Sequence, residues 1–136
     1  MIFKVVDKVY VTFEVYEELS KCKELVKSLI EAMKRYPIDL IESEDYSKLR
    51  ERYPILGKGE LSVIASAKGK IAFIEDRKAE KIAEEVGVIV FNIPVLLLVL
   101  KEKGLIDRSE IAQIIDDLKV KDGYLFKKEI KDELLR

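Results

Sequence analysis

GELSVIASAKGKIAFIED, residues 59–76, is the stretch that decides the fold. Small and apolar residues from Ser62 to Ala67 predict a helix, and after a glycine the apolar run 71–74 predicts a short strand. A strand that follows a helix after so short a turn returns antiparallel to it. The acids at the two ends, Glu60 on one side and the pair Glu75 and Asp76 on the other, are therefore expected to converge, as acids do in many α/β hydrolytic sites.

The same alternation of short apolar strands and helices extends along the chain. Further strands are expected at residues 8–12, 38–41 and 88–91, because these runs are β-branched and apolar. Helices are expected at 13–35, 44–53, 59–67, 77–86, 94–103, after residue 107 or 109, and near the C-terminus. This order predicts an α/β fold: one domain, residues 1–136, with three α/β/α layers around a central, mainly parallel sheet of about four strands.

Composition indicates a folded protein without a strong electrostatic field. Hydrophobic residues make up 49% and charged residues 38%, and 25 basic against 26 acidic side chains leave a net charge of -1. Nucleic-acid binding would therefore depend on local patches. The single cysteine, Cys22, excludes an internal disulfide and fits a reducing cytoplasm. No signal peptide is recognised, and the longest apolar run, residues 93–100, is too short to span a membrane, so a cytoplasmic protein is expected.

The absence of histidine excludes whole classes of site. Ser-His-Asp and Cys-His catalysis and imidazole-bound zinc all need a residue that this chain lacks, and one cysteine cannot build a thiolate cluster. Carboxylate chemistry, lysine chemistry or no chemistry remain. The scarcity of amides, with only Asn92 and Gln113, amid many Lys and Glu is typical of thermophile proteins.

Two glutamates lie on apolar rows of their predicted helices. Glu18 shares its row with Val15, Cys22 and Leu25, and Glu60 is followed by apolar residues three, four and seven positions later. An acid on such a row lies either at the rim of the core or in a site. For Glu60 a structural alternative is a favourable interaction with the helix dipole.

Other acids have structural interpretations too. Asp76 is suited to cap the helix that begins at Arg77. Glu14 and Glu17 share rows with Lys21, which indicates a solvated helix face. Spacing alone leaves both the structural and the functional interpretation of Asp76 open.

Four segments resemble the PIN-domain superfamily. They are KVYVTFEVYEEL, LGKGELSVIASA, IAFIEDRKAEKIAEEVGV, and LLLVLKEKGLI with the later IDDLKVKDGYLFKKEIKDELL. Each is short, but together they cover most of the chain from Lys8 onward in the family's order. In particular, they resemble an uncharacterised prokaryotic PIN-like branch related to the toxin ribonucleases (VapC-type) of toxin–antitoxin pairs.

The resemblance implies a metal-dependent ribonuclease. PIN domains hold Mg²⁺ or Mn²⁺ with three or four carboxylates at the carboxyl ends of parallel strands, and oxygen ligands suit such hard cations. Matched position by position, the family's acids fall on Glu18, Glu60, Glu75 and Asp76. Glu18, Glu60 and Asp76 are the implied catalytic metal ligands, and Glu75 is a fourth ligand or a supporting partner.

Basic residues beside these acids are candidates for phosphate contacts. They are Lys58, Lys68, Arg77 and Lys78, and the structural alternative for all four is ordinary solvated charge. The implied partners are an RNA substrate, an antitoxin protein and a second copy of the chain. The apolar helix near residues 95–100 would serve that dimer, although burial within the monomer explains it equally well.

Three departures from the family favour an alternative without catalysis. The chain begins close to the family's second strand, so the first acid is expected to be missing unless Asp7 replaces it after a strand at residues 2–6. Glu75 stands where an aspartate is usual, and Asn92 starts a segment in which relatives carry a hydroxyl. The alternatives are therefore an inactive PIN-like module that binds RNA or protein, and an unrelated small α/β regulatory domain.

Overall fold

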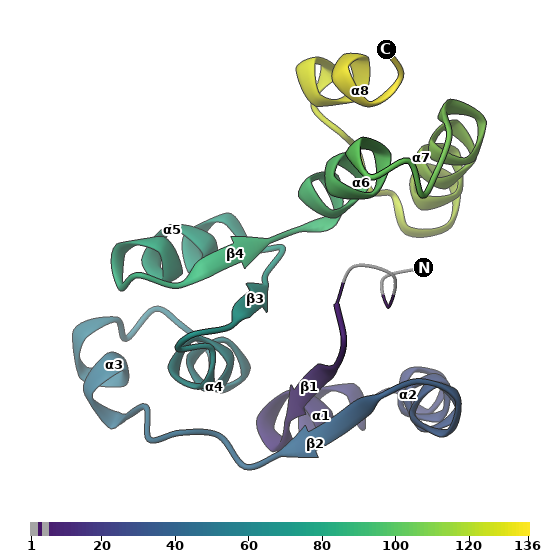
Figure 1. Cartoon of the computed structure of the whole chain (residues 1–136). Coiled ribbons are helices and arrows are strands. Elements are labelled where there is room, and N and C mark those ends of the chain that lie inside the picture. The colour runs from purple at the N-terminus through teal and green to yellow at the C-terminus, as the bar shows by residue number, and fades with distance from the viewer. Residues whose placement is uncertain (1–2, 4–5) are drawn as a thin grey trace. The chain divides into compact units, whose positions relative to one another are not determined.

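The computed structural model describes residue 3 and residues 6–136, and the chain divides into two compact units (Figure 1). Met1–Phe91 contains all the described strands, and Asn92–Arg136 is helical. The prediction of one domain over residues 1–136 stays a prediction. The strand suggested for residues 2–6 falls largely outside the described residues.

The first unit alternates strands and helices in the expected order. Its elements are β1 (Val9–Thr12), α1 (Phe13–Leu19), α2 (Lys23–Arg35), β2 (Ile38–Ile41), α3 (Ser47–Arg52), α4 (Lys58–Ser66), β3 (Ile71–Phe73), α5 (Arg77–Glu85) and β4 (Ile89–Phe91). The second unit consists of α6 (Ile93–Glu102), α7 (Arg108–Asp122) and α8 (Lys128–Leu134). No helix in residue 3 or residues 6–136 is both long and apolar enough to cross a membrane.

The strands confirm the α/β class and its parallel pairing. β1 pairs with β2 from Val9↔Ile38 to Thr12↔Ile41, and β3 pairs with β4 from Ile71↔Ile89 to Phe73↔Phe91, both in parallel. The arrangement differs from the expected single sheet, because the four described strands form two separate two-stranded sheets. Each pair is a local β-α-β unit, and the chain between them is helical, so α4 rather than a strand ladder links the two.

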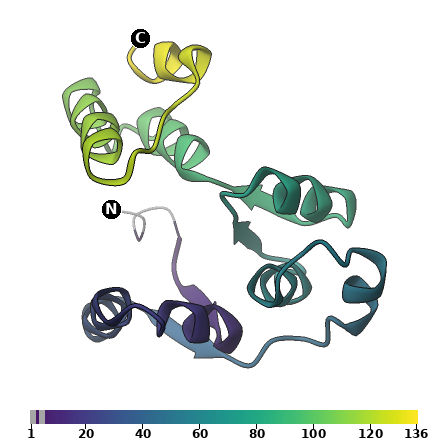
Figure 2. The ribbon, with the colours of Figure 1, turned by 180° about the vertical axis from the view of Figure 1, so that it is seen from behind.

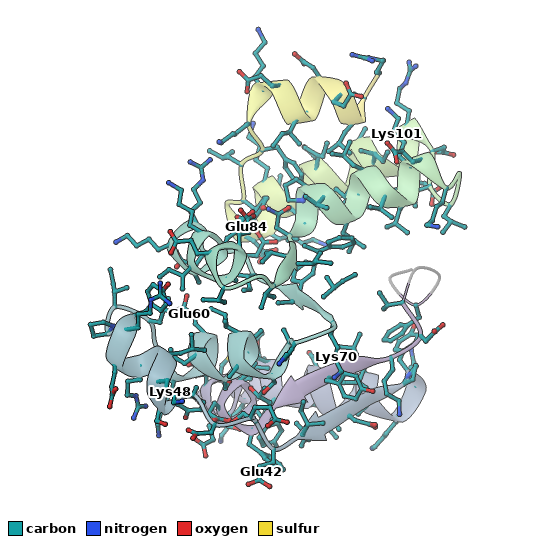
Figure 3. The ribbon with its side chains drawn as sticks, turned by 60° about the vertical axis from the view of Figure 1, so that its left-hand side comes forward. Glu42, Lys48, Glu60, Lys70, Glu84 and Lys101 are labelled. Atoms are coloured by element: carbon teal, nitrogen blue, oxygen red, sulfur yellow. The ribbon has the colours of Figure 1, made fainter. Side chains whose placement is uncertain are left out.

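Helix α4 is the element that joins the two β-α-β units. It contacts α1 and β1 on one side and α3 on another. Turned by 180°, Figure 2 shows the purple α1 in front of the β1–β2 pair. A second link is Lys70, labelled in Figure 3, whose Nζ lies 5.6 Å from the ring centroid of Tyr10 in β1. The acids of α1 and α4 are thus carried on two helices in direct contact.

The helices begin directly after their predicted capping residues, but one helix that was expected to be continuous is interrupted. Thr12, Asp76, Asn92 and Asp107 each accept a hydrogen bond from a backbone amide in the first turn of the helix that follows. The continuous helix expected over 13–35 breaks between Leu19 and Lys23. The Ser20 hydroxyl donates to the Tyr16 carbonyl at 2.8 Å, and Cys22 next to the break is exposed instead of facing a core.

The main core of the first unit lies beneath α4 and α5. Leu61 and Ile64 of α4 are 1% and 3% exposed, and Ala79 and Ala83 of α5 are fully buried. Alanines let α5 approach the β3–β4 pair closely, which contributes Ala72 to the same cluster. This core holds α4 in place from one side.

A pair of buried hydroxyls holds α4 from the other side. Thr12, at the end of β1, is 3% exposed and its Oγ1 lies 2.8 Å from the Oγ of Ser62, which is fully buried. The Ser62 hydroxyl also lies 2.7 Å from the Gly59 carbonyl and donates to it. Because Ser62 donates to Gly59, Thr12 is the donor in the hydroxyl pair. The pair therefore connects the carboxyl end of β1 to the first turn of α4.

Replacing Ser62 by alanine is expected to lower the free energy of unfolding by about 1–3 kcal/mol, because the Thr12 hydroxyl would stay buried without its acceptor. Adding Thr12→Val should cost less than the sum of the two single changes, since the unpaired group is then removed. Urea unfolding measures all three variants. Ser20→Ala, which removes an exposed hydroxyl, is the control, and strictly additive losses at Thr12 and Ser62 would contradict the coupling.

Candidate metal and phosphate site

Glu18 lies at the end of α1 with its carboxylate against the first turn of α4. Its side chain is exposed to solvent, yet its Oε1 is within 2.6 Å of where a Cβ on Gly59 would stand. Gly59 is itself buried. The interpretation of Glu18 as an acid at the rim of the core, facing another element, fits this position.

Glu60 stabilises the start of its own helix. Its Oε1 accepts a hydrogen bond of 3.1 Å from the backbone N–H of Gly57, the residue that precedes α4. This is the half of a capping box that a glycine N-cap permits. Figure 3 labels Glu60 on α4. Glu60 therefore has a structural role in the cap of its own helix, at the first-turn position that the helix-dipole interpretation requires. Glu18 and Glu60 both border the first turn of α4.

The second pair of acids stands at the start of α5. Asp76 Oδ2 accepts a 3.1 Å hydrogen bond from the backbone N–H of Ala79, so the predicted N-cap is confirmed. Glu75 precedes it and is exposed. Arg77 and Lys78 occupy the first turn of α5 and are exposed as well.

The four basic residues are carried by different elements of the fold. Lys58 is the first residue of α4, whereas Lys68 follows its C-cap, Ala67. At 1.5 Å per residue the two lie about 15 Å apart along the helix. Arg77 and Lys78 belong to α5. Of the four, Lys58 is the cation beside the Glu18–Glu60 end of α4.

The carboxylate oxygens present suit a hard divalent cation, but only if water and substrate phosphates supply its remaining ligands. Among residue 3 and residues 6–136, no three acidic side chains come together closely enough to hold a metal ion. Mg²⁺ commonly takes one or two carboxylates from a protein, while waters and substrate phosphates supply its other oxygens. Glu18 and Glu60 offer two carboxylates at the same helical turn. Asp76 and Glu75 are carried by a different element.

Glu14, interpreted from the sequence as part of a solvated helix face, instead accepts a hydrogen bond from another segment of the chain, so that interpretation is wrong. It is half-buried, its Oε2 accepts a 2.7 Å hydrogen bond from the Ser43 hydroxyl, and the Tyr46 hydroxyl donates to it as well. The segment after β2, which carries both partners, folds over α1. Glu14 precedes Glu18 by four residues and so shares its helix face, which is the signal that the sequence offered.

The interaction between Glu14 and Tyr46 shifts their pKa values in opposite directions. Burial opposes ionisation of Glu14, but the hydrogen bonds from Ser43 and Tyr46, with the charge of Lys58, hold its pKa below the ordinary 4.5. The hydrogen bond to Glu14 raises the pKa of Tyr46 above its ordinary 10.0, and burial adds to that. Glu14 is therefore ionised and Tyr46 neutral over the whole physiological pH range, and their hydrogen bond connects α1 to the segment before α3.

The stabilisation from this pair is expected to be full between about pH 5 and pH 9. A lowered carboxyl pKa gives stability that is present above 4.5 and lost as the pH falls through the lowered value. A raised tyrosine pKa gives stability that is present below 10.0 and lost as the pH rises through the raised value. Thermal unfolding of wild type and Tyr46→Phe across pH measures it. The difference in Tm between them should shrink below pH 4.5, and a pH-independent difference would contradict the coupling.

The sequence of this chain matches one known protein family over its whole length. A family model described as a PIN domain matches residues 1–136, the whole of the printed sequence. The search of curated proteins found no match, and neither did the search of solved structures. The family model also agrees with the mixed helix and parallel-strand architecture. This chain therefore belongs to the PIN-domain family.

Proposed function

We propose that this PIN domain is a ribonuclease that uses Mg²⁺ or Mn²⁺ to cleave RNA. The observation that carries the proposal is the position of the Glu18 carboxylate against Gly59 in the first turn of α4, the turn that also contains Glu60. These two acids come from helices in direct contact and border one turn, as a shared cation site requires. A PIN domain is a nuclease-like fold in general terms, which makes phosphodiester hydrolysis the reaction to test first.

The proposed roles follow from where each side chain lies. Glu18 and Glu60 hold the cation through carboxylate oxygens, and Lys58 at the same end of α4 meets a backbone phosphate. Asp76 and Glu75, at the start of α5, complete the acidic set when RNA is bound, and Arg77 and Lys78 contact flanking phosphates, with Lys68 farther along the strand. The bound cation would supply an activated water and neutralise charge on the scissile phosphate.

The biological setting is proposed by likeness to the toxin ribonucleases. Under this proposal the chain is a cytoplasmic toxin-like enzyme that is inhibited by an antitoxin protein and pairs with a second copy of itself. The exposed free thiol of Cys22 is compatible with a reducing compartment. The apolar α6 supplies surface for a dimer, although its residues Leu97 and Leu100 are already buried.

A second candidate function is an inactive PIN domain that binds RNA or protein. Two observations favour it. Glu60 and Asp76 each have one carboxylate oxygen engaged in a helix cap, and the described residues contain no group of three acids that could hold a metal ion. A protein with these acids kept for helix capping alone would retain the fold and lose the chemistry.

One assay separates the two candidates. Purified protein is incubated with end-labelled single-stranded RNA and Mn²⁺, with EDTA in a parallel tube, and both cleavage and complex formation are followed on gels. Mn²⁺-dependent cleavage supports the ribonuclease. A stable complex without cleavage overturns it in favour of the binding module. If the protein neither cleaves nor binds the RNA, that result contradicts RNA as the ligand in both proposals.

A further inference from the structure

Gly59 is a glycine because of the space that it leaves, not because of its backbone. A Cβ built on Gly59 would lie 2.6 Å from Oε1, 3.0 Å from Cδ and 3.2 Å from Oε2 of Glu18, so all three nearest atoms belong to one carboxylate. Real Cβ atoms essentially never approach another atom closer than 3.0 Å. Gly59 does not have a positive φ, and glycine is disfavoured inside a helix. The nearest obstacle to a larger residue at position 59 is therefore the Glu18 carboxylate.

The other glycine at this helix provides the contrast. At Gly57, the N-cap two residues earlier, the nearest atom to an added Cβ is Oε1 of Glu60 at 3.7 Å, an ordinary van der Waals contact. Both glycines precede or open α4, and neither has a positive φ. Only Gly59 would be in conflict with an acid if it gained a methyl group.

We propose that Gly59 is a positioning residue that seats the Glu18 carboxylate on the first turn of α4 and so sets its place beside Glu60. The inference rests on the proposed ribonuclease function, because it assigns the seat to the cation held by these two acids. The positive end of the α4 dipole favours a carboxylate at this turn. A methyl group on residue 59 would displace the carboxylate from its present position against this turn.

The conflict is with the far end of a flexible side chain, which predicts how a variant behaves. In Gly59→Ala the Glu18 side chain can swing into solvent, because it is exposed, so the protein should fold and unfold at or above the wild-type temperature. The position of the carboxylate is what changes. Function and stability are therefore expected to separate in this variant.

The first measurement needs neither metal nor RNA. The side-chain carboxyl ¹³C resonance of Glu18, assigned by comparison with Glu18→Gln, should shift in Gly59→Ala and stay in place in the matched control Gly57→Ala. The same two variants are then titrated with Mn²⁺, with free ion followed by electron paramagnetic resonance. Gly59→Ala should weaken Mn²⁺ binding about 10-fold or more, and Gly57→Ala should leave it unchanged.

A rescue variant distinguishes positioning from a general effect. Aspartate is one methylene shorter than glutamate, so Glu18→Asp alone should weaken Mn²⁺ binding, whereas in the Gly59→Ala background it should restore part of the affinity by making room for the methyl group. An unchanged Glu18 resonance in Gly59→Ala overturns the seat. A shifted resonance with unchanged Mn²⁺ affinity overturns the positioning role. If the wild-type protein binds no Mn²⁺, the proposed function is overturned, and the positioning role of Gly59 is overturned with it. The shift of the Glu18 resonance would still show that the side chains at positions 59 and 18 are in contact.

Discussion

Glutamine in place of Glu60 is expected to slow RNA cleavage at least about 100-fold without unfolding α4. Even partners one step removed from a metal ligand change affinity or activity by about 10–100-fold, so a ligand should matter at least as much. Glutamine keeps the carbonyl oxygen that accepts from the Gly57 N–H, and it is as suitable as glutamate in a capping box. The change therefore removes charge while it preserves the helix start. Single-turnover cleavage of labelled RNA in Mn²⁺ measures the effect.

The same logic selects the companion variants. Asp76→Asn keeps an oxygen for the Ala79 N–H, because asparagine caps helices as well as aspartate does, and Glu18→Gln removes charge at the seat on Gly59. Alanine would be a poorer choice at Glu60 and Asp76, since it would also remove a helix cap at a cost of about 1 kcal/mol. Losses in these three variants with unchanged melting temperatures would place the acids in the chemistry.

The second helical unit contains a matched control for this experiment. At the start of α7, Asp107 accepts from the Glu110 N–H at 2.8 Å and Glu110 accepts from the Asp107 N–H at 3.2 Å. Asp107→Asn and Glu110→Gln therefore make the same substitutions at the same helix positions, in a helix that carries none of the proposed site residues. They should leave cleavage unchanged. An equal loss in the α7 variants, or full activity in Glu60→Gln, would contradict the assignment.

Local sequence patterns were sufficient to predict where most helices and strands lie, but not how the strands combine into sheets. Caps such as Thr12 and Asp76 act on the next turn of the chain, so the positions of helix starts follow from neighbouring residues. The break between α1 and α2 was missed because the apolar spacing continues through it and no proline or glycine marks it. Whether two parallel pairs join depends on contacts between residues far apart in the chain, which alternation does not encode.

The site was predictable only in part, for a similar physical reason. Periodicity separated Glu18 and Glu60 from the many other acids, and the structure brings both to the first turn of α4. It did not find Glu14, because its partners Ser43 and Tyr46 are about thirty residues away and belong to a loop. The importance of Gly59 was also hidden, since a close approach from another helix leaves no local pattern around a glycine.

Alanine at Leu61 or at Leu134 is expected to lower the free energy of unfolding by about 2–5 kcal/mol in each case. Leu61 is 1% exposed in the core beneath α4, and Leu134 of α8 is fully buried in the helical unit, so each substitution leaves a cavity. For a chain of 136 residues this corresponds to a fall in Tm of about 7–17 °C. Differential scanning calorimetry measures the shift, and Leu125→Ala, at a residue that is 75% exposed, is the control with little expected change.

The pair of variants also tests whether residues 1–136 behave as one domain. If the chain unfolds cooperatively, Leu61→Ala in the first unit and Leu134→Ala in the second must lower the same single transition, with equal calorimetric and van't Hoff enthalpies. The family match over the whole chain leads us to expect that result. Two transitions, one moved by each variant, would contradict it and would make Asn92–Arg136 an independently folding unit. In that case the acids of the first unit would keep their site without α6, α7 and α8, because Glu18, Glu60 and Asp76 all precede Asn92.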